Sequence, residues 1–260
     1  MELDAFLEIK ELTSDGSGNG CGDTNAPFTE VTLGAEKVPL SWFSSGLTAD
    51  VEAKFTFDGK VPLPIDLGGQ MALNGDINFQ AFDLHDLAVA MAFGATENYV
   101  ALKGGVRFNG FDFSGAAFFG KTCTLDPLLL IDPDVAKVLG NPPFTGGYVY
   151  AQGWLPVSQL VTGIPATCLF EISAGVGAGA FYFAEGPTFG GKMFLGVSGQ
   201  LLCIVSIEGD ITMIGVDKAG HLTFNGKGHF EADLGPCPFC ISISKSVSIT
   251  YIPVSSWDIQ

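Results

Sequence analysis

Strict alternation of apolar and polar residues is the feature of this chain that most limits how it can fold. The clearest example is residues 222–234, LTFNGKGHFEADL, where Leu, Phe, Gly and Ala share one parity and polar or charged residues share the other. A period of two sends successive side chains to opposite faces of a strand, so the pattern indicates a strand with one apolar face. Because similar segments recur along most of the 260 residues, the sequence predicts an all-β protein.

The alternation places most of the expected strands. A single strand over residues 193–213 would extend about 70 Å, so a bend or hairpin is expected near Ser198-Gly199 or within 208–210. One short connector helix is expected at 132–139, where Asp132 can cap, Pro133 suits the first turn and Gly140 ends the segment. Strands are expected at 4–10, 49–57, 70–79, 87–93, 99–108, 111–119, 148–154, 169–183, 193–213, 222–234 and 241–252.

Asn-Gly pairs and a glycine-containing loop indicate where turns are expected. Apolar parity switches at Asn109-Gly110, which indicates a turn or bulge, whereas it does not switch at Asn225-Gly226, which we expect inside a strand. Residues 216–220 are predicted to form a hairpin loop with Gly220 in the left-handed conformation.

These elements predict a large antiparallel β-sandwich or a partly open, strongly coiled barrel, with long strands and at most one short connector helix. The Pro- and Gly-rich stretch after residue 139 is the expected boundary between an N-terminal region, 1–139, and a C-terminal region, 140–260. The alternation also suits a transmembrane barrel, but frequent Pro and Cys and uneven strand lengths argue against it.

Charge limits the partners of the chain. The 12 Lys and Arg against 28 Asp and Glu give a net charge of −16, which repels phosphate backbones and argues against nucleic acid. Charged residues make up only 15% of the chain, whereas about 25% is typical. Either much of the chain is buried on both faces, or an apolar surface is covered by a partner, by lipid or by further copies of the chain.

No signal peptide is evident after Met1, because the next residues are neither basic nor apolar. The uncharged run 138–170 is long enough to span a bilayer, but repeated Pro and Gly break any helix there. We therefore expect no helical membrane span.

Six cysteines suggest disulfides and an oxidising compartment, which favours an extracellular or cell-surface location. Cys237-Pro238-Phe239-Cys240 is a CxxC pair, interpreted as a disulfide or paired buried thiols; a metal site and a redox dithiol are the alternatives. A strand follows it, so the helix N-terminus that activates redox thiols is missing. The disulfide candidates are Cys21, Cys123, Cys168, Cys237 and Cys240.

Residues 15–20, DGSGNG, resemble the opening of a calcium-binding loop. The twelfth position, where an EF-hand places a bidentate Glu, is Ala26, and no helices flank the segment. We interpret the segment as a surface loop, with calcium bound by Asp15, Asn19 and Asp23 as the alternative. No other cofactor is expected.

Catalysis has no support in the sequence. The three histidines show no HExxH spacing, and neither a GxSxG elbow nor a Walker-type motif is present. The carboxylate pairs Asp83 with Asp86 and Asp132 with Asp134 are expected in turns and helix caps rather than in acid–base chemistry.

We therefore expect a non-enzymatic structural protein of the cell exterior, which self-assembles into a filament, sheath or surface layer. A β-shell carrier of lipid or another apolar ligand is the alternative. The run 200–207, QLLCIVSI, needs a covering partner strand, and strand addition between copies would supply it. The assembly-edge candidates are Leu201, Leu202, Ile204, Val205 and Ile207.

Overall fold

The chain is all-β: one large antiparallel sheet of fourteen strands, which does not close, with three short helices among the described residues. The all-β antiparallel prediction is confirmed, and a single open sheet agrees with the partly open architecture rather than with two packed sheets. The structure is a computed structural model. It describes residues 4–12, 28–40, 47–57, 63–79, 81–162, 170–184, 186–202, 204–235 and 241–252.

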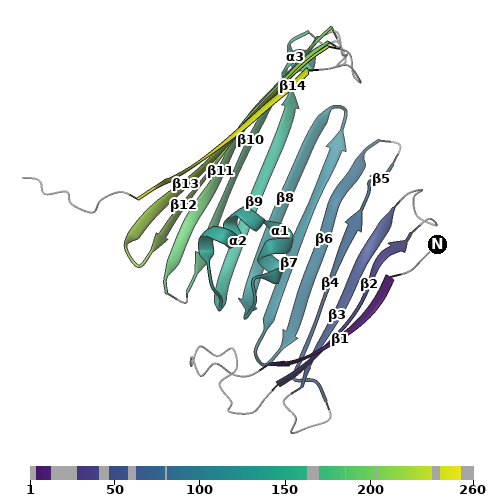
Figure 1. The fold of residues 1–260 in the computed structure, drawn as a ribbon, viewed down its shortest axis with the longest axis vertical. Helices are drawn as coiled ribbons and strands as arrows, with labels where there is room; N and C mark the ends of the chain where they lie inside the picture. The colour runs from purple at the N-terminus through teal and green to yellow at the C-terminus, as the bar shows by residue number, and fades with distance from the viewer. Residues whose placement is uncertain are drawn as a thin grey trace, which may run out of the picture. The chain divides into compact units, whose positions relative to one another are not determined.

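The strands follow one another as a meander (Figure 1). Each main-path strand pairs with the strands before and after it, from β1 to β14, while the two-residue β5 pairs only with β6. The strands are β1 (Asp4–Leu12), β2 (Phe28–Pro39), β3 (Thr48–Phe57), β4 (Asp66–Asn74), β5 (Ile77–Asn78), β6 (Asp83–Gly94), β7 (Asn98–Phe108), β8 (Phe111–Thr122), β9 (Phe144–Pro156), β10 (Phe170–Phe183), β11 (Thr188–Leu201), β12 (Val205–Lys218), β13 (His221–Leu234) and β14 (Ile241–Tyr251).

The predicted turn at Asn109-Gly110 and the left-handed Gly220 are confirmed, but the predicted loop 216–220 is shorter than expected because β12 continues to Lys218. Asn109 and Gly110 form the β7–β8 turn with φ values of 48° and 82°, as the parity switch predicts. Gly220 has φ 87° in the β12–β13 turn, and its backbone N–H donates to Asp217 Oδ1 at 2.8 Å. Asn225 and Gly226 lie inside β13, as expected from the unbroken parity.

Three strand predictions need correction. The expected strand 70–79 is instead the end of β4, a break at 75–76 and the two-residue β5. The segment 193–213 forms a hairpin as expected, but β11 ends at Leu201 and β12 begins at Val205, so the two strands do not meet at either predicted site. Strand β2 was not among the expected strands: its alternation at Val31, Leu33 and Ala35 breaks at an irregularity in register between Ala35 and Val38. Such a break hides the period of two from a sequence reading.

The prediction of at most one helix is wrong. The expected helix is α2 (Pro133–Leu139), and its predicted cap is confirmed because the Asp132 side chain accepts hydrogen bonds from the Asp134 and Val135 backbone nitrogens. Helices α1 (Asp126–Ile131) and α3 (Val157–Thr162) are additional. A helix of six residues makes fewer than two turns, so its sequence does not repeat an amphipathic pattern. Tertiary packing rather than local propensity therefore stabilises these helices.

The described chain divides into two compact units. The first comprises residues 1–106, 116–149 and 183–185, and the second comprises 107–115, 150–182 and 186–260. The predicted boundary after residue 139 falls within the first unit. Since the chain passes between the units more than once, a linear boundary does not describe this division.

The core of the first unit lies between its helices and one face of its strands (Figure 1). Leu128 of α1 and Val135 of α2 are fully buried, as is Phe118 of β8. The Phe118 ring stacks on Tyr99 with ring centroids 5.8 Å apart. The helices therefore seal the middle of this face and leave the opposite face of the strands uncovered.

The second unit has its own aromatic cluster. The Trp154 and Phe194 rings meet edge to face, with centroids 5.6 Å apart. Gly175 and Gly196 lie beneath the Trp154 ring, since a Cβ at either position would come within 2.8 Å of it. Trp154 is therefore a packing residue, which is the ordinary role of a lone tryptophan.

Candidate functional site

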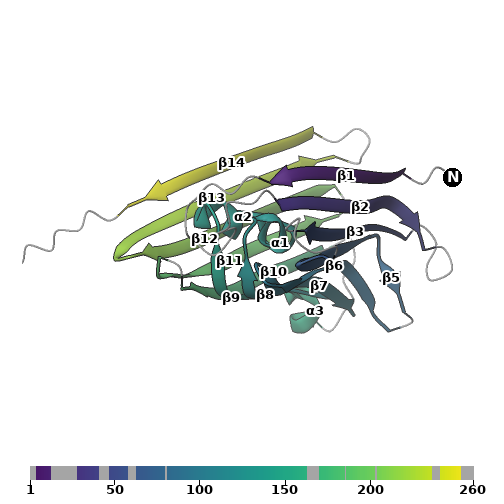
Figure 2. The same cartoon turned by 90° about the horizontal axis from the view of Figure 1, so that it is seen from below.

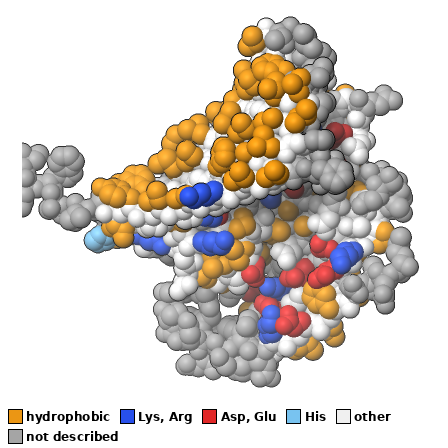
Figure 3. Space-filling view, turned by 45° about the horizontal axis from the view of Figure 1, so that its top comes forward, with side chains coloured by type: hydrophobic (Ala, Val, Ile, Leu, Met, Phe, Trp, Pro, Cys, Tyr) orange, Lys and Arg blue, Asp and Glu red, His pale blue; other side chains and the backbone are white. Residues whose placement is uncertain are grey.

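The second unit exposes one apolar face of its sheet, here called the apolar face. It is formed by every second residue of strands β10 to β14, the set that carries the exposed apolar side chains. Twenty of its described large apolar side chains are more than a third exposed. They are Phe170, Ile172, Val176, Tyr182, Phe189, Met193, Leu195, Val197, Leu201, Ile207, Ile211, Met213, Leu222, Phe230, Leu234, Ile241, Ile243, Val247, Ile249 and Tyr251. Figure 3 shows hydrophobic side chains gathered over these strands with few charged atoms among them.

Strand register explains why the face is uniform. Because β11 to β14 pair residue against residue without a shift, their apolar parities line up in rows across the sheet. One such row is Leu195, Ile211, Gly228 and Val247. The polar parity lines up on the other face in the same way. Across β10 to β14 the apolar parity carries only two charged residues, Asp217 and Lys245.

The exposed apolar area is large for a protein surface. Full burial of one large apolar side chain stabilises a protein by about 1.5–3 kcal/mol. Burial of the exposed halves of twenty such side chains would therefore add hydrophobic stabilisation on the order of 20 kcal/mol. At about 25 cal/mol per Å², this corresponds to about 800 Å². The largest apolar patch of a typical monomer is about 300–600 Å², so the apolar face has the size of an interaction surface.

The strands of the first unit repeat the pattern on a smaller scale. Leu7 of β1 lies opposite Leu33 of β2, and these side chains are 62% and 46% exposed. Leu67 of β4 lies opposite Phe93 of β6, and both are about half exposed. The helices cover only the other face of these strands, so an uncovered apolar parity is common to both units.

The sheet has two free edges among the described strands, because β1 and β14 end the strand order (Figure 2). Every residue of β14 is exposed, with Ser and Thr on one face and mainly Ile and Val on the other. Lys245 stands in the middle of the apolar parity of this edge strand, opposite Phe230. A charge in this position is a known device against uncontrolled edge pairing.

The predicted assembly-edge residues lie elsewhere: Leu201, Leu202, Ile204, Val205 and Ile207 surround the β11–β12 turn. Leu202 is 57% exposed, and Leu201, Ile204 and Ile207 are 46–48% exposed. Strands β11 and β12 pair with each other and are flanked by β10 and β13. These residues therefore add to the exposed apolar surface, but the edges available for strand addition are β1 and β14.

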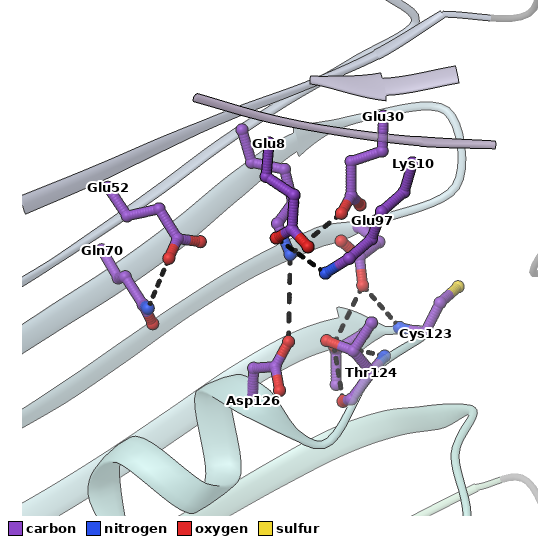
Figure 4. Close-up of polar contacts among 11 residues, drawn as sticks. Glu8, Lys10, Glu30, Glu52, Gln70, Glu97, Cys123, Thr124 and Asp126 are labelled. Carbon is purple, nitrogen blue, oxygen red and sulfur yellow. Dashed lines mark hydrogen bonds and ion pairs between the residues drawn. The ribbon is translucent and has the colours of Figure 1, made fainter. Parts of the chain in front are cut away.

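A polar groove of about 440 Å³ lies between β1–β4 and α1 in the first unit (Figure 4). Lys54 Nζ lies 3.7 Å from Glu30 Oε1 and 3.8 Å from Asp126 Oδ2, so it connects β2, β3 and α1. Lys10 Nζ pairs with Glu8 Oε2 at 2.9 Å, and this contact raises the pKa of Lys10. Both lysines of the groove thus lie against acidic side chains.

The remaining carboxylates of this region also have donors (Figure 4). Gln70 Nε2 donates to Glu52 Oε2 at 3.3 Å. Glu97 Oε1 accepts from the Cys123 backbone N–H at 2.7 Å and from the Thr122 hydroxyl at 3.1 Å. These contacts hold the loop before α1 against the sheet.

Asp66, which is 5% exposed and does not line the groove itself, makes a buried contact on β4. It accepts from the Thr96 backbone N–H at 2.9 Å and from the Thr96 hydroxyl. Nearby, burial raises the pKa of Tyr99, and the charge of Glu97 acts in the same direction. The polar contacts in and beside the groove therefore form a structural network that joins β1–β4, β7 and α1.

Comparisons with protein-family models, with curated proteins and with solved structures find no match for this chain. Its function must therefore be inferred from its own residues.

The other predicted sites fall largely outside the described residues. This holds for Asp15, Asn19 and Asp23 of the calcium candidate. It also holds for four of the five disulfide candidates, Cys21, Cys168, Cys237 and Cys240. Cys123 is the one described cysteine; it lies between β8 and α1, and it is disulfide-bonded rather than free.

The described residues also lack a metal-binding cluster and a membrane-spanning helix. They contain no group of three or more His, Cys, Asp or Glu side chains arranged to hold a metal ion. Within the same ranges, the helices are all too short or too polar to cross a membrane.

Proposed function

We propose that this chain is a non-enzymatic structural protein of the cell exterior, a subunit that assembles with copies of itself into a filament, sheath or surface layer. The observation that carries the proposal is the apolar face of β10 to β14. Water contact with that much apolar surface is unfavourable, and burial against other copies would recover the free energy. The free edges β1 and β14 offer a second kind of contact, strand addition, by which an assembly can grow.

The polar chemistry of the chain supports an assembly role. The charged side chains of the groove have partners within the chain, such as Glu30 for Lys54 and Gln70 for Glu52, and the net charge of −16 keeps an apolar chain soluble before it assembles. The even number of cysteines favours an oxidising, extracellular setting.

Assembly state tests this proposal directly. Size-exclusion chromatography with light scattering, in non-reducing buffer and over a hundredfold range of concentration, should show species larger than the 27.3 kDa chain whose share rises with concentration. Negative-stain microscopy of the large fraction should show ordered filaments or sheets. A monomer at every concentration, without ordered particles, would overturn the proposal.

A carrier of a lipid or another apolar ligand is the second candidate. It is favoured by the near absence of hydrogen-bonding side chains on the apolar face, where Lys245 is the only charge away from the strand ends. A hydrocarbon chain needs no such partners. Solvent extraction and mass spectrometry of the purified protein should then recover about one lipid or more per chain, and a clean extract would exclude the carrier function.

A further inference from the structure

Strand β13 carries a hollow in the apolar face, next to the edge strand β14. Two successive positions of its apolar parity are glycines, and the neighbouring strands place large apolar side chains beside both. Their register partners are Ile211 and Met213 on β12 and Val247 and Ile249 on β14. We call this feature the glycine hollow: Gly226 and Gly228 form its floor, and Ile211, Met213, Val247 and Ile249 form its walls.

The fold of the chain itself does not require glycine at either position. Neither Gly226 nor Gly228 has a positive φ. A Cβ on Gly226 would approach nothing closer than the Ile249 carbonyl oxygen at 3.8 Å, and one on Gly228 nothing closer than the Asp210 carbonyl oxygen at 3.8 Å. Because glycine in a strand interior costs chain entropy and packs no side chain, two open glycines indicate that something else approaches the sheet closely here.

A ridge that matches the hollow stands on the same strand. Residues 224–230 read F-N-G-K-G-H-F, so Phe224 and Phe230 flank the two glycines on one face. Phe230 is 47% exposed, and its Cα lies about 7 Å along the strand from that of Gly228. A ridge beside a hollow is what a two-fold interface requires, because each copy then offers both halves of the contact.

We propose that two copies pack the apolar faces of their second units against each other about a two-fold axis, with Phe230 of each copy in the glycine hollow of the other. This inference rests on the proposed function and names the face and the partner that it uses. The exposed apolar area, on the order of 800 Å² per copy, is comparable with the area that each partner of a standard stable interface buries, about 800 Å². Face-to-face packing of two sheets about 10 Å apart would form an apolar core between them.

The polarity of the opposite face is consistent with this pairing. Strands β12 to β14 carry their charged residues on the other parity, such as Glu208 and Lys227, apart from Asp217 and Lys245. Pairing of two apolar faces would therefore leave polar faces outward in water. The edges β1 and β14 would stay available for the growth of a filament or layer.

Filling the hollow tests the proposal in the full-length chain. Gly228→Val adds apolar surface and suits a strand, so nonspecific hydrophobic association or lipid binding would stay the same or strengthen. Shape-specific packing predicts the opposite, a dimer Kd at least tenfold higher by analytical ultracentrifugation. Phe230→Ala should weaken the dimer by a similar factor.

The matched control Ser244→Val, on the polar parity of β14, should leave the Kd within twofold, and circular dichroism should show that all variants fold.

The outcomes separate the two proposals. If the wild-type chain is monomeric at all concentrations, both this pairing and the proposed function are overturned. If assembly persists and neither Gly228→Val nor Phe230→Ala changes the Kd, the pairing is overturned while assembly through other surfaces stands. If lipid is recovered in equal amounts from wild type and Gly228→Val and no dimer forms, the apolar face serves a ligand and the pairing is overturned.

Discussion

Asp132 and Tyr148 meet in the core of the first unit, where the Tyr148 hydroxyl donates a hydrogen bond to Oδ2 of the Asp132 carboxylate. The side chains are nearly inaccessible, with 5% of Asp132 and 1% of Tyr148 exposed. Asp132 Oδ1 accepts from the backbone nitrogens of Asp134 and Val135, each at 3.2 Å. One carboxylate thus starts α2 and fastens it to β9.

Tyr148→Phe should lower the free energy of unfolding by about 1–3 kcal/mol. The substitution removes the hydroxyl donor and leaves a buried carboxylate oxygen with one partner fewer. Urea unfolding followed by circular dichroism measures the effect. Tyr182→Phe is the control, since Tyr182 is 56% exposed, and it should change stability by less than about 0.5 kcal/mol. Equal stabilities of the two variants would show that the buried bond contributes nothing.

Asp50 should make stability depend on pH below its ordinary pKa of 3.8. The Lys37 backbone N–H, at 2.8 Å, and the Asn74 amide, at 2.7 Å, donate to its carboxylate and lower the pKa of Asp50. Because the folded-state pKa is the lower one, this contribution is fully present above pH 3.8 and is lost as pH falls through the folded-state value.

The measurement compares wild type with Asp50→Asn. The stability difference between them should be constant above about pH 5 and should shrink as pH falls below 3.8. Carboxyl NMR titration should place the Asp50 pKa below 3.8 and should show that Asn74→Ala raises it. A stability difference that grows on acidification would contradict the assignment.

Gly120→Ala should destabilise the chain by about 3 kcal/mol or more. Gly120 has φ 123°, and a Cβ there would lie 2.1 Å from the Asn98 carbonyl oxygen, which is fixed backbone. Gly68→Ala is the matched control in the same unit, because its Cβ would meet only ordinary contacts, the closest at 3.4 Å to the Met91 carbonyl oxygen. The control should stay within about 0.5 kcal/mol in the same urea experiment. A Gly120→Ala variant as stable as this control would refute the clash.

Lys245→Ile should increase self-association. Lys245 interrupts the apolar parity of the edge strand β14, so its replacement removes a charge that opposes edge pairing. Light scattering should detect assemblies at a concentration several times lower than for wild type. Lys227→Ile, on the polar parity of β13, is the control and should shift that concentration less. An unchanged onset for Lys245→Ile would show that the β14 edge takes no part in assembly.

The period of two was sufficient to predict most of the strands and both faces of the sheet. Alternation over 222–234 predicted β13 and assigned its apolar parity, because side-chain direction in a strand follows residue number. The parity switch at Asn109-Gly110 placed a turn for the same reason. The alternation of β2 escaped recognition because of its register irregularity, and α1 because six residues contain too little helical period.

The sequence predicted that an apolar surface exists but not where it lies. The deficit of charge predicted an uncovered apolar surface, since too few ions were present to cover an ordinary exterior. Its location depended on which strands became neighbours: pairing of β11 with β12 put Leu201 and Ile207 in the interior of the strand order and left β1 and β14 at the edges.

The sequence by itself determined most of the strands, the helix cap at Asp132 and which face of each strand is apolar, because these follow from local periodicity and local hydrogen bonding. Only the tertiary structure decided that Tyr148 would meet Asp132 and that Gly226 and Gly228 would lie between the side chains of β12 and β14. Such contacts join residues far apart in the chain, and their register is set by the pairing of whole strands rather than by any short segment.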